Sequence, residues 1–209
     1  MTILFMRSRN RTPSQIIGYG LYLYFLGLSF RNAANKALSF LLLVKISHVS
    51  IWNWLQKYKP TKKYRKNNKI IEFIVDETAI KAGSELIWLW RVVIEPNDKE
   101  ILEVDISKNR NISITKRFLS GVVNKYGLHS VSSDGGTWYP QACKFLKLNH
   151  HLHSSFEKSI IERTVQYIKD RTTESFDDYF PCKKNKCKLK HVKQWLKMFV
   201  YQHNKEILP

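Results

Sequence analysis

The sequence IIEFIVDETAIKAGSELIWLWRVVIEPNDKEILEVDIS, residues 70–107, contains three apolar runs that are separated by turn-prone residues. The runs are IIEFIVDE, LIWLWRVVIE and EILEVDIS, with residues 81–84 and 96–99 between them. Apolar runs of this length, bounded by Gly, Ser, Pro and Asn, are typical of strands. The segment therefore predicts an antiparallel meander of three strands.

The residues after this meander alternate between helical and strand-like patterns. We expect a helix over 113–126, a short strand over 128–133, a helix after Pro140 and a helix over about 159–171. Residues 188–203 have apolar side chains on one face and lysines on the other, which predicts a basic amphipathic helix. This order of elements is that of a ribonuclease-H-like α/β domain, which we expect over residues 70–209.

Residues 1–58 are predicted to form a small all-helical region, in which Ser14, Ser29 and Ser47 are well placed to cap helices. In the segment HVSIWNWLQKY one face is apolar and consists of Val49, Trp52 and Leu55, with Ile51 at its margin. The other face is polar and consists of His48, Ser50, Asn53, Gln56 and Lys57. Two short helices of this kind favour a helix-turn-helix that places its second helix in the major groove of DNA. An ordinary helical hairpin would give the same pattern.

Residues 59–69, KPTKKYRKNNK, have no apolar periodicity and many like charges, which predicts a basic linker. We expect its cationic side chains to contact DNA phosphates: Lys62, Lys63, Arg65 and Lys66. A solvated tether explains the same composition equally well.

The formal net charge of +18 is far larger than solubility requires. A polyphosphate such as DNA is the usual partner of so basic a chain, although an anionic membrane surface or a lysine-rich genome also gives such a composition. The longest apolar stretch, residues 16–30, is too short to span a bilayer, and the first residues lack a signal-peptide pattern. We therefore expect a cytoplasmic, nucleoid-associated protein.

The three cysteines, an odd number, argue against a disulfide framework and agree with a reducing compartment. Cys182 and Cys187, followed by His191, have a spacing that could belong to a zinc site, but a fourth ligand is not evident in the sequence.

Three acidic residues follow or lie within predicted elements in a pattern that suits metal-dependent phosphodiester chemistry. Asp76 ends the apolar strand IIEFIV, Asp134 follows the strand LHSVSS, and Glu162 lies on a helix. Such chemistry uses carboxylates that hold two divalent cations about 4 Å apart. Asp76 could also be a strand-terminal turn residue, and Asp134 could belong to an Asp-Gly turn.

Glu162 has an alternative interpretation as part of a capping box with Ser159. Ser154 and Glu157 offer the same signature upstream, in which case Glu162 lies within the helix. Lys169 follows Glu162 by seven residues and therefore lies on the same helical face within roughly 20°.

The blocks IIEFIVDET, SSDGGTWYP and SIIERTVQYIKDRT resemble the DDE transposases of bacterial and archaeal insertion sequences, most closely the insertion-sequence-six family. The segments GLSFRNAA and SHVSIWNWLQKY resemble that family's helix-turn-helix, so the resemblance covers about residues 20–175. It implies a catalytic triad of Asp76, Asp134 and Glu162, with Lys169 beside it. The stretch from Asp134 to Glu162 is shorter than usual, which could mean a trimmed loop or an inactive copy. The presence of all three acids and of Lys169 favours the trimmed loop.

The resemblance implies a transposase that binds the terminal inverted repeats of its element, cleaves a strand and directs a 3'-hydroxyl at target DNA. Two Mg2+ or Mn2+ ions are the implied cofactors, with Asp76 bridging both. The implied partners are double-stranded DNA, at the element ends and at the target, and a second copy of the chain in a homodimer. A DNA-binding regulator or inactive derivative and a nuclease without joining activity are the alternatives.

Overall fold

The computed structural model describes residues 12–38, 45–58, 70–82, 85–94, 100–179 and 189–207. The chain forms two compact units, Met1–Lys63 with Gln194–Gln202 and Tyr64–Lys193 with His203–Pro209. Helix α8 (Leu189–Ile207) contributes residues to both units. The domain limits expected from the sequence, at 58 and 70, stay a prediction.

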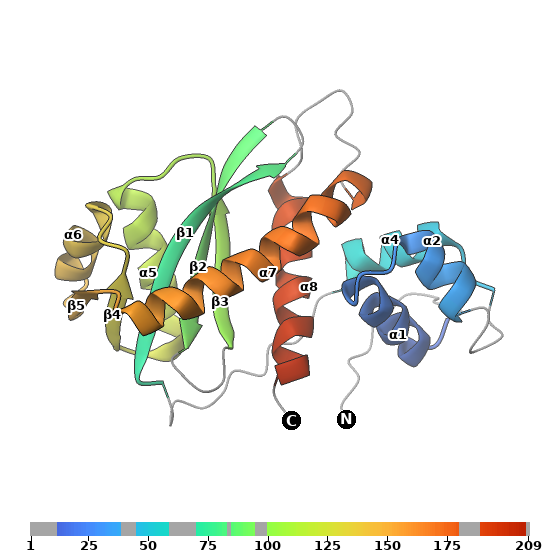
Figure 1. Cartoon of the computed structure of the whole chain (residues 1–209), viewed down its shortest axis with the longest axis horizontal. Coiled ribbons are helices and arrows are strands. Elements are labelled where there is room, and N and C mark those ends of the chain that lie inside the picture. Colours follow the sequence, from blue (N-terminus) through green and yellow to red (C-terminus); the bar gives the residue numbers. More distant parts are fainter. Residues whose placement is uncertain are drawn as a thin grey trace. The chain divides into compact units, whose positions relative to one another are not determined.

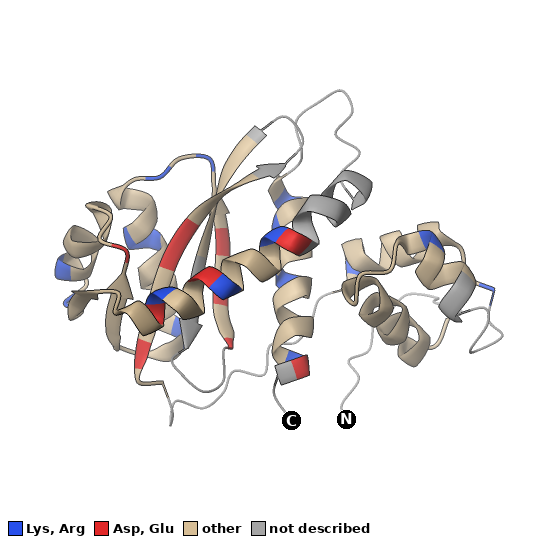
Figure 2. Ribbon diagram, viewed as in Figure 1, with Lys and Arg blue, Asp and Glu red and all other residues tan. Residues whose placement is uncertain are grey.

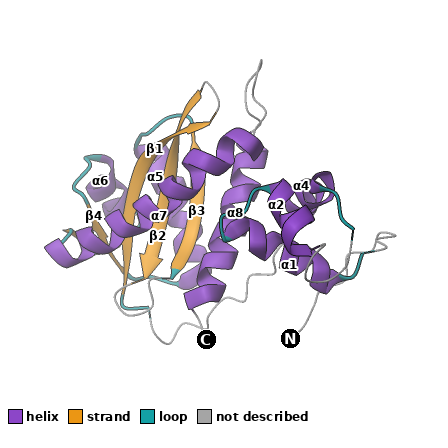
Figure 3. Ribbon diagram, turned by 45° about the vertical axis from the view of Figure 1, so that its right-hand side comes forward, coloured by secondary structure: helices purple, strands orange, loops and turns teal. Residues whose placement is uncertain are grey.

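The second unit contains a five-stranded mixed sheet with the strand order β3-β2-β1-β4-β5 (Figures 1 and 3). Its strands are β1 (Glu72–Ala82), β2 (Glu85–Ile94), β3 (Ile101–Ser107), β4 (Ser130–Ser133) and β5 (His150–Leu152). The first three strands pair antiparallel, which confirms the predicted meander, and β4 and β5 are parallel to β1. The predicted α/β class is thus confirmed.

Helices cover both faces of this sheet. Helix α5 (Ile112–Tyr126) and helix α6 (Trp138–Phe145) pack on the face that carries Phe73 and Val75, whereas α7 (Ser155–Tyr179) crosses the other face (Figure 1). There Ile74 packs against Ile160 and Ile161 of α7. Successive residues of β1 therefore face two different buried layers, because side chains alternate along a strand.

The prediction that the strand ends at Asp76 is wrong, because β1 continues to Ala82. Strand β2 pairs with β1 along this whole length, from Phe73 opposite Ile94 to Ala82 opposite Glu85. An antiparallel partner supplies backbone hydrogen bonds to polar as well as to apolar residues, so the strand extends beyond the end of its apolar run.

Two further elements differ from the sequence prediction. The short strand β5, with the sequence HHL, was not expected, because three residues with exposed or half-exposed side chains give no apolar run. Helix α6 begins at Trp138 rather than after Pro140. Proline is tolerated in the first turn of a helix, where its missing N–H would have no partner in the helix.

The start of α7 decides between the two capping boxes seen in the sequence. The Glu157 N–H donates to Ser154 Oγ at 3.3 Å, and the Ser154 N–H donates to the Glu157 carboxylate. The helix therefore starts earlier than the predicted residue 159, and it extends beyond residue 171. Glu162 lies inside this helix, so it does not serve as the capping residue.

The described residues of the first unit lie mostly in helices, as predicted for this part of the chain. Its elements are α1 (Ser14–Phe25), α2 (Phe30–Asn32), the π-helix η1 (Ala33–Leu38) and α4 (His48–Lys57). Ser29 and Ser47 cap their helices as predicted, since each hydroxyl accepts a backbone N–H at 3.2 Å. The predicted cap at Ser14 is wrong, because Pro13 precedes the helix and Ser14 is its first residue.

The apolar face of α4 differs from the predicted one. Ile51 and Leu55 are fully buried, whereas Val49 is 50% exposed. The core of this unit also includes Trp195 of α8, whose Nε1 donates to Tyr24 Oη at 2.9 Å. The buried face of α4 is therefore centred on Ile51, which the sequence analysis placed at the margin of the apolar face.

No helix in the described part of the chain is long and apolar enough to cross a membrane.

The capping box of α7 should contribute measurably to stability. Replacing Ser154 with Ala removes the acceptor for the Glu157 N–H and is expected to lower the free energy of unfolding by about 1 kcal/mol. Urea denaturation of the whole chain measures this loss. Ser155→Ala, an exposed change in the same turn, serves as the control and should cost less.

Glu157 should also make the stability of the protein depend on acid. Burial raises its pKa, but hydrogen bonds from Ser154 and His151 and with Glu72 outweigh burial and hold the pKa at about 2, below the ordinary 4.5. A depressed folded-state pKa gives stability that is present above the unfolded pKa and lost between about pH 5 and pH 2. Urea denaturation at several pH values in this range should show that Glu157→Gln loses less unfolding free energy on acidification than wild type does. An identical loss in the two proteins would contradict a depressed pKa at Glu157.

Candidate active site

Asp76 and Asp134 lie beside each other because each comes just after the last residue pair of the parallel ladder between β1 and β4. The ladder between β1 and β4 ends at the pair of Ile74 and Ser132, and each aspartate comes two residues later. Their carboxylate oxygens and that of Glu77 all lie within 4.8 Å of one another. Figure 2 shows the acidic residues gathered on β1 and its surroundings. Two of the three acids expected from the sequence are thus brought together.

The turn after β4 orients the Asp134 side chain. The Gly136 N–H donates to Asp134 Oδ1 at 3.0 Å, and Gly135 has a φ of 87°. A Cβ at Gly136 would come within 2.7 Å of the Trp138 ring. The Asp-Gly turn seen in the sequence is therefore present, and it aims the carboxylate at the acidic group.

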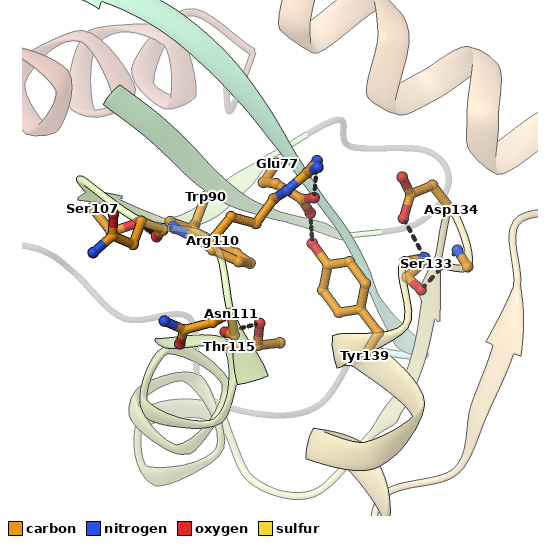
Figure 4. A network of polar contacts seen from close by, with 12 residues as sticks. Glu77, Trp90, Ser107, Arg110, Asn111, Thr115, Ser133, Asp134 and Tyr139 are labelled. Atoms are coloured by element: carbon orange, nitrogen blue, oxygen red, sulfur yellow. Dashed lines mark hydrogen bonds and ion pairs between the residues drawn. The ribbon is translucent and has the colours of Figure 1, made fainter. Parts of the chain in front are cut away.

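Glu77, next to Asp76, is a member of this group that sequence reasoning missed. Its side chain is only 1% exposed, and Tyr139 Oη donates to Oε2 while Arg110 Nη1 donates to Oε1 at 3.2 Å (Figure 4). Successive residues of a strand usually face opposite sides, so the strand pattern does not group Glu77 with Asp76. Beyond Ile74 the strand is no longer paired with β4, and both carboxylates reach Asp134.

Burial and charge together set the protonation of this network. Burial raises the pKa of Glu77, Asp134 and Asp76 raise it further, and the hydrogen bond from Tyr139 and the charge of Arg110 lower it. The pKa of Tyr139 is raised well above 10, first by burial and then by the Glu77 carboxylate. Tyr139 therefore keeps its proton and acts as a hydrogen-bond donor.

Two histidines of the β5 region support the end of β4. His153 Nδ1 lies 2.7 Å from Ser132 Oγ, and His150 Nε2 lies 2.8 Å from Ser133 Oγ. Burial lowers the pKa of both imidazoles, so both are neutral at neutral pH. These contacts fix the backbone just before Asp134.

A second group of potential ligands consists of Glu72, His151 and Glu157. His151 Nε2 lies 3.1 Å from Glu157 and 3.4 Å from Glu72. The Glu157 carboxylate also accepts the backbone N–H of Ser154, the residue before α7, so these contacts tie β1, β5 and the start of α7 together. Helix capping and ion pairing explain this group.

Glu162 and Lys169 both lie on α7 with exposed side chains. Glu162 directly follows Ile161, which packs against Ile74 of β1. Among the described residues, the acidic group around Asp76 contains Glu77 and does not include Glu162. The role of Glu162 and of Lys169 remains a prediction.

The polar residues of α4 that were predicted to read DNA are not equally accessible. His48 and Lys57 are exposed, whereas Ser50, Asn53 and Gln56 are half-buried. Ser50, Asn53 and Lys57 line a pocket of about 260 Å³ that includes residues at and before the start of α1.

The predicted contacts of the linker, Lys62, Lys63, Arg65 and Lys66, lie outside the described residues. So do Cys182 and Cys187 of the possible zinc site, while His191 lies in α8.

The donor set of the main acidic group suits a hard divalent cation. Three carboxylates with oxygens within 4.8 Å of one another can bind Mg2+ or Mn2+ through oxygen alone. Cys143, the cysteine in this unit that the structure describes, lies on the buried face of α6. The acidic residues present therefore fit the cofactors expected from the sequence.

One protein family matches more than half of the chain. Residues 70–203 match the family described as DDE domain. An uncharacterized protein of Methanocaldococcus jannaschii is 32% identical over 207 residues, which cover 96% of this chain and 90% of that protein. Similar solved structures include the catalytic core domain of BIV integrase, with 16% identity, a TM-score of 0.47 and coverage of 62% of this chain and 82% of that chain. Another is the simian T-cell lymphotropic virus intasome, with 17% identity, a TM-score of 0.48 and coverage of 84% and 67%.

The fold and the acidic group define the class first: an α/β domain with carboxylates gathered just beyond the point where two adjacent parallel strands stop pairing. The match over residues 70–203 then shows the family, and the chain belongs to the DDE-domain transposases of insertion sequences. The resemblance seen in the sequence is confirmed at this level. Membership of the insertion-sequence-six family stays a prediction.

The hydrogen bond from Tyr139 to Glu77 should be worth more than an ordinary tyrosine hydrogen bond. Tyr139→Phe leaves a buried carboxylate without one of its donors and is expected to cost about 1.5–3 kcal/mol of unfolding free energy. Tyr126→Phe is the matched control, since its buried hydroxyl donates to the neutral carbonyl of Leu102 at 2.9 Å and should cost about 1 kcal/mol. Equal losses in urea denaturation would contradict a charged acceptor at Glu77.

Proposed function

We propose that this protein is a DNA transposase that binds the terminal inverted repeats of its element and then cuts and joins DNA strands. The observation that carries the proposal is the meeting of the Asp76 and Asp134 carboxylates within 4.8 Å, in a chain of the DDE-domain family. The formal charge of +18 supports DNA as the partner.

In this proposal Asp76, Asp134 and Glu162 would hold two Mg2+ or Mn2+ ions. When bound, such ions activate an oxygen nucleophile and neutralise charge on the phosphate that reacts. The carboxylates orient the attacking water or 3'-hydroxyl and the leaving oxygen on opposite sides of the phosphorus. The attack is in line and needs no covalent enzyme intermediate.

Helix α7 is proposed to supply both Glu162 and a cation. It lies against β1 through Ile160 and Ile161, which supports a position for Glu162 near the strand that carries Asp76. Lys169 lies on the same helix seven residues later and would contact a phosphate near the reacting bond.

The helical unit is proposed to recognise the element ends as a helix-turn-helix, with α4 in the major groove. Contacts would come from the residues predicted to read DNA, and the linker cations would bind phosphates. Pairing of two DNA ends implies a homodimer. The protein would act in the cytoplasm on DNA of the nucleoid.

Replacement of a metal-binding carboxylate should abolish strand transfer. Asp76→Asn, Asp134→Asn and Glu162→Gln keep side-chain size but remove charge, and each is expected to reduce Mg2+-dependent joining by at least about 100-fold, the upper loss seen for partners of metal ligands. Labelled DNA that carries an element end, incubated with and without Mn2+, reports new strand joints.

Asp170→Asn is the matched control for Glu162→Gln, because Asp170 is an exposed acid of the same helix that accepts a hydrogen bond from Gln166. It should leave joining unchanged. Full activity of Asp76→Asn would refute the proposal. Salt-dependent DNA binding without joints in any metal would indicate a regulator or inactive derivative, and cut but unjoined products would indicate a nuclease.

A further inference from the structure

Arg110 is held in a fixed position beside the candidate active site. It lies in the segment between β3 and α5, where Figure 2 shows basic residues. Its guanidinium carbon lies 4.1 Å from the centre of the Trp88 ring and 4.4 Å from that of Trp138. Two indole rings from separate elements, β2 and α6, therefore restrict this side chain, which lowers the entropy cost of using it to bind a ligand.

The guanidinium is also one hydrogen bond away from the acidic group. Nη1 donates to Glu77 Oε1 at 3.2 Å, and the Glu77 carboxylate lies within 4.8 Å of the ligand atoms of Asp76 and Asp134. Figure 4 shows the Arg110 guanidinium beside the Glu77 carboxylate. A polyanion that enters the site would therefore meet this cation beside the carboxylates.

The ion pair with Glu77 leaves other N–H donors of the Arg110 guanidinium for a ligand. An arginine has five N–H donors in one plane, and stacking on aromatic rings uses the face of the group rather than its N–H bonds. The Arg110 side chain is 36% exposed, whereas Glu77 is 1% exposed and also receives a hydrogen bond from Tyr139. Donors thus remain for a ligand from solvent.

The chemistry of these donors selects the ligand. A planar guanidinium matches two oxygens of one phosphodiester better than any other group of DNA outside the base edges. Both indoles already contact the guanidinium, which argues against stacking of a nucleobase on it. An arginine that faces an acidic site also offsets part of the repulsion between the carboxylates and an incoming phosphate.

We propose that Arg110 binds a DNA phosphodiester next to the one that reacts, and that Trp88, Trp138 and Glu77 fix its guanidinium for this contact. The inference rests on the proposed function, since it takes DNA as the substrate. It adds a phosphate-binding residue on the α5 side of the site, opposite in the fold to Lys169 of α7.

A phosphate scan tests the contact directly. Duplexes that carry an element end are made with a single neutral methylphosphonate at successive positions, and binding to the full chain is measured by fluorescence anisotropy. Wild-type protein should lose about 10-fold in affinity at the position that Arg110 contacts. Arg110→Gln should lose a similar factor on unmodified DNA, and it should lose nothing further when that one phosphate is neutral.

Arg117→Gln is the matched control, because Arg117 is an exposed arginine on α5 and its loss changes the net charge equally. It should remain sensitive to the same phosphate as wild type. Arg110→Lys keeps the charge but loses the planar fork, so it should bind with intermediate affinity; it also serves if Arg110→Gln fails to fold.

The scan measures binding and needs no catalysis, so its failure is separate from failure of the proposed function. If wild type forms no strand joints but Arg110→Gln becomes insensitive to one phosphate, the phosphate contact stands without the transposase activity. If Arg110 variants stay as sensitive as wild type at every position, the proposed contact is wrong even in an active enzyme.

Discussion

The parallel pairing of β1 with β4 is the constraint on which the candidate site depends. The ladder stops at Ile74 and Ser132, while β1 continues beside β2. Two parallel strands rise in the same direction by nearly the same step, so Asp76 and Asp134 reach the same point two residues later. A slip of one residue would reverse the side-chain alternation and separate the carboxylates. Burial of β1 side chains on both faces of the sheet holds this register.

The acids brought together in this way repel one another, and the surrounding residues limit the cost. Burial and the two aspartates raise the pKa of Glu77, while Tyr139 and Arg110 lower it. A buried carboxylate without donors would be far more costly, which explains why both of its oxygens are hydrogen-bonded. Divalent cations would relieve the remaining repulsion between the carboxylates most directly. The donors Tyr139 and Arg110 and the proposed cations therefore both reduce the cost of placing these acids together.

Much of this arrangement could be predicted from the sequence, because long apolar runs and turn residues are local signals. The meander, the helix after it and the position of Asp134 directly after a strand follow from such signals, whereas the strand end expected at Asp76 is wrong. Glu77 could not be found in this way, since its grouping depends on where the β1–β4 pairing stops, which is a property of two distant segments. The strand β5 was missed for a similar reason, because its three residues are stabilised by pairing with β4 rather than by an apolar run.

Local and functional interpretations of one residue are not always alternatives. Asp134 accepts the Gly136 N–H in an Asp-Gly turn, and this hydrogen bond gives the carboxylate a fixed direction toward Asp76. For Glu162 the two interpretations do compete, because a capping carboxylate is occupied by backbone N–H groups. Glu157 takes that role with Ser154 one and a half turns earlier, which leaves Glu162 exposed on the second turn of α7. The cap therefore sets where the helix begins, and by doing so it sets which acid is available for chemistry.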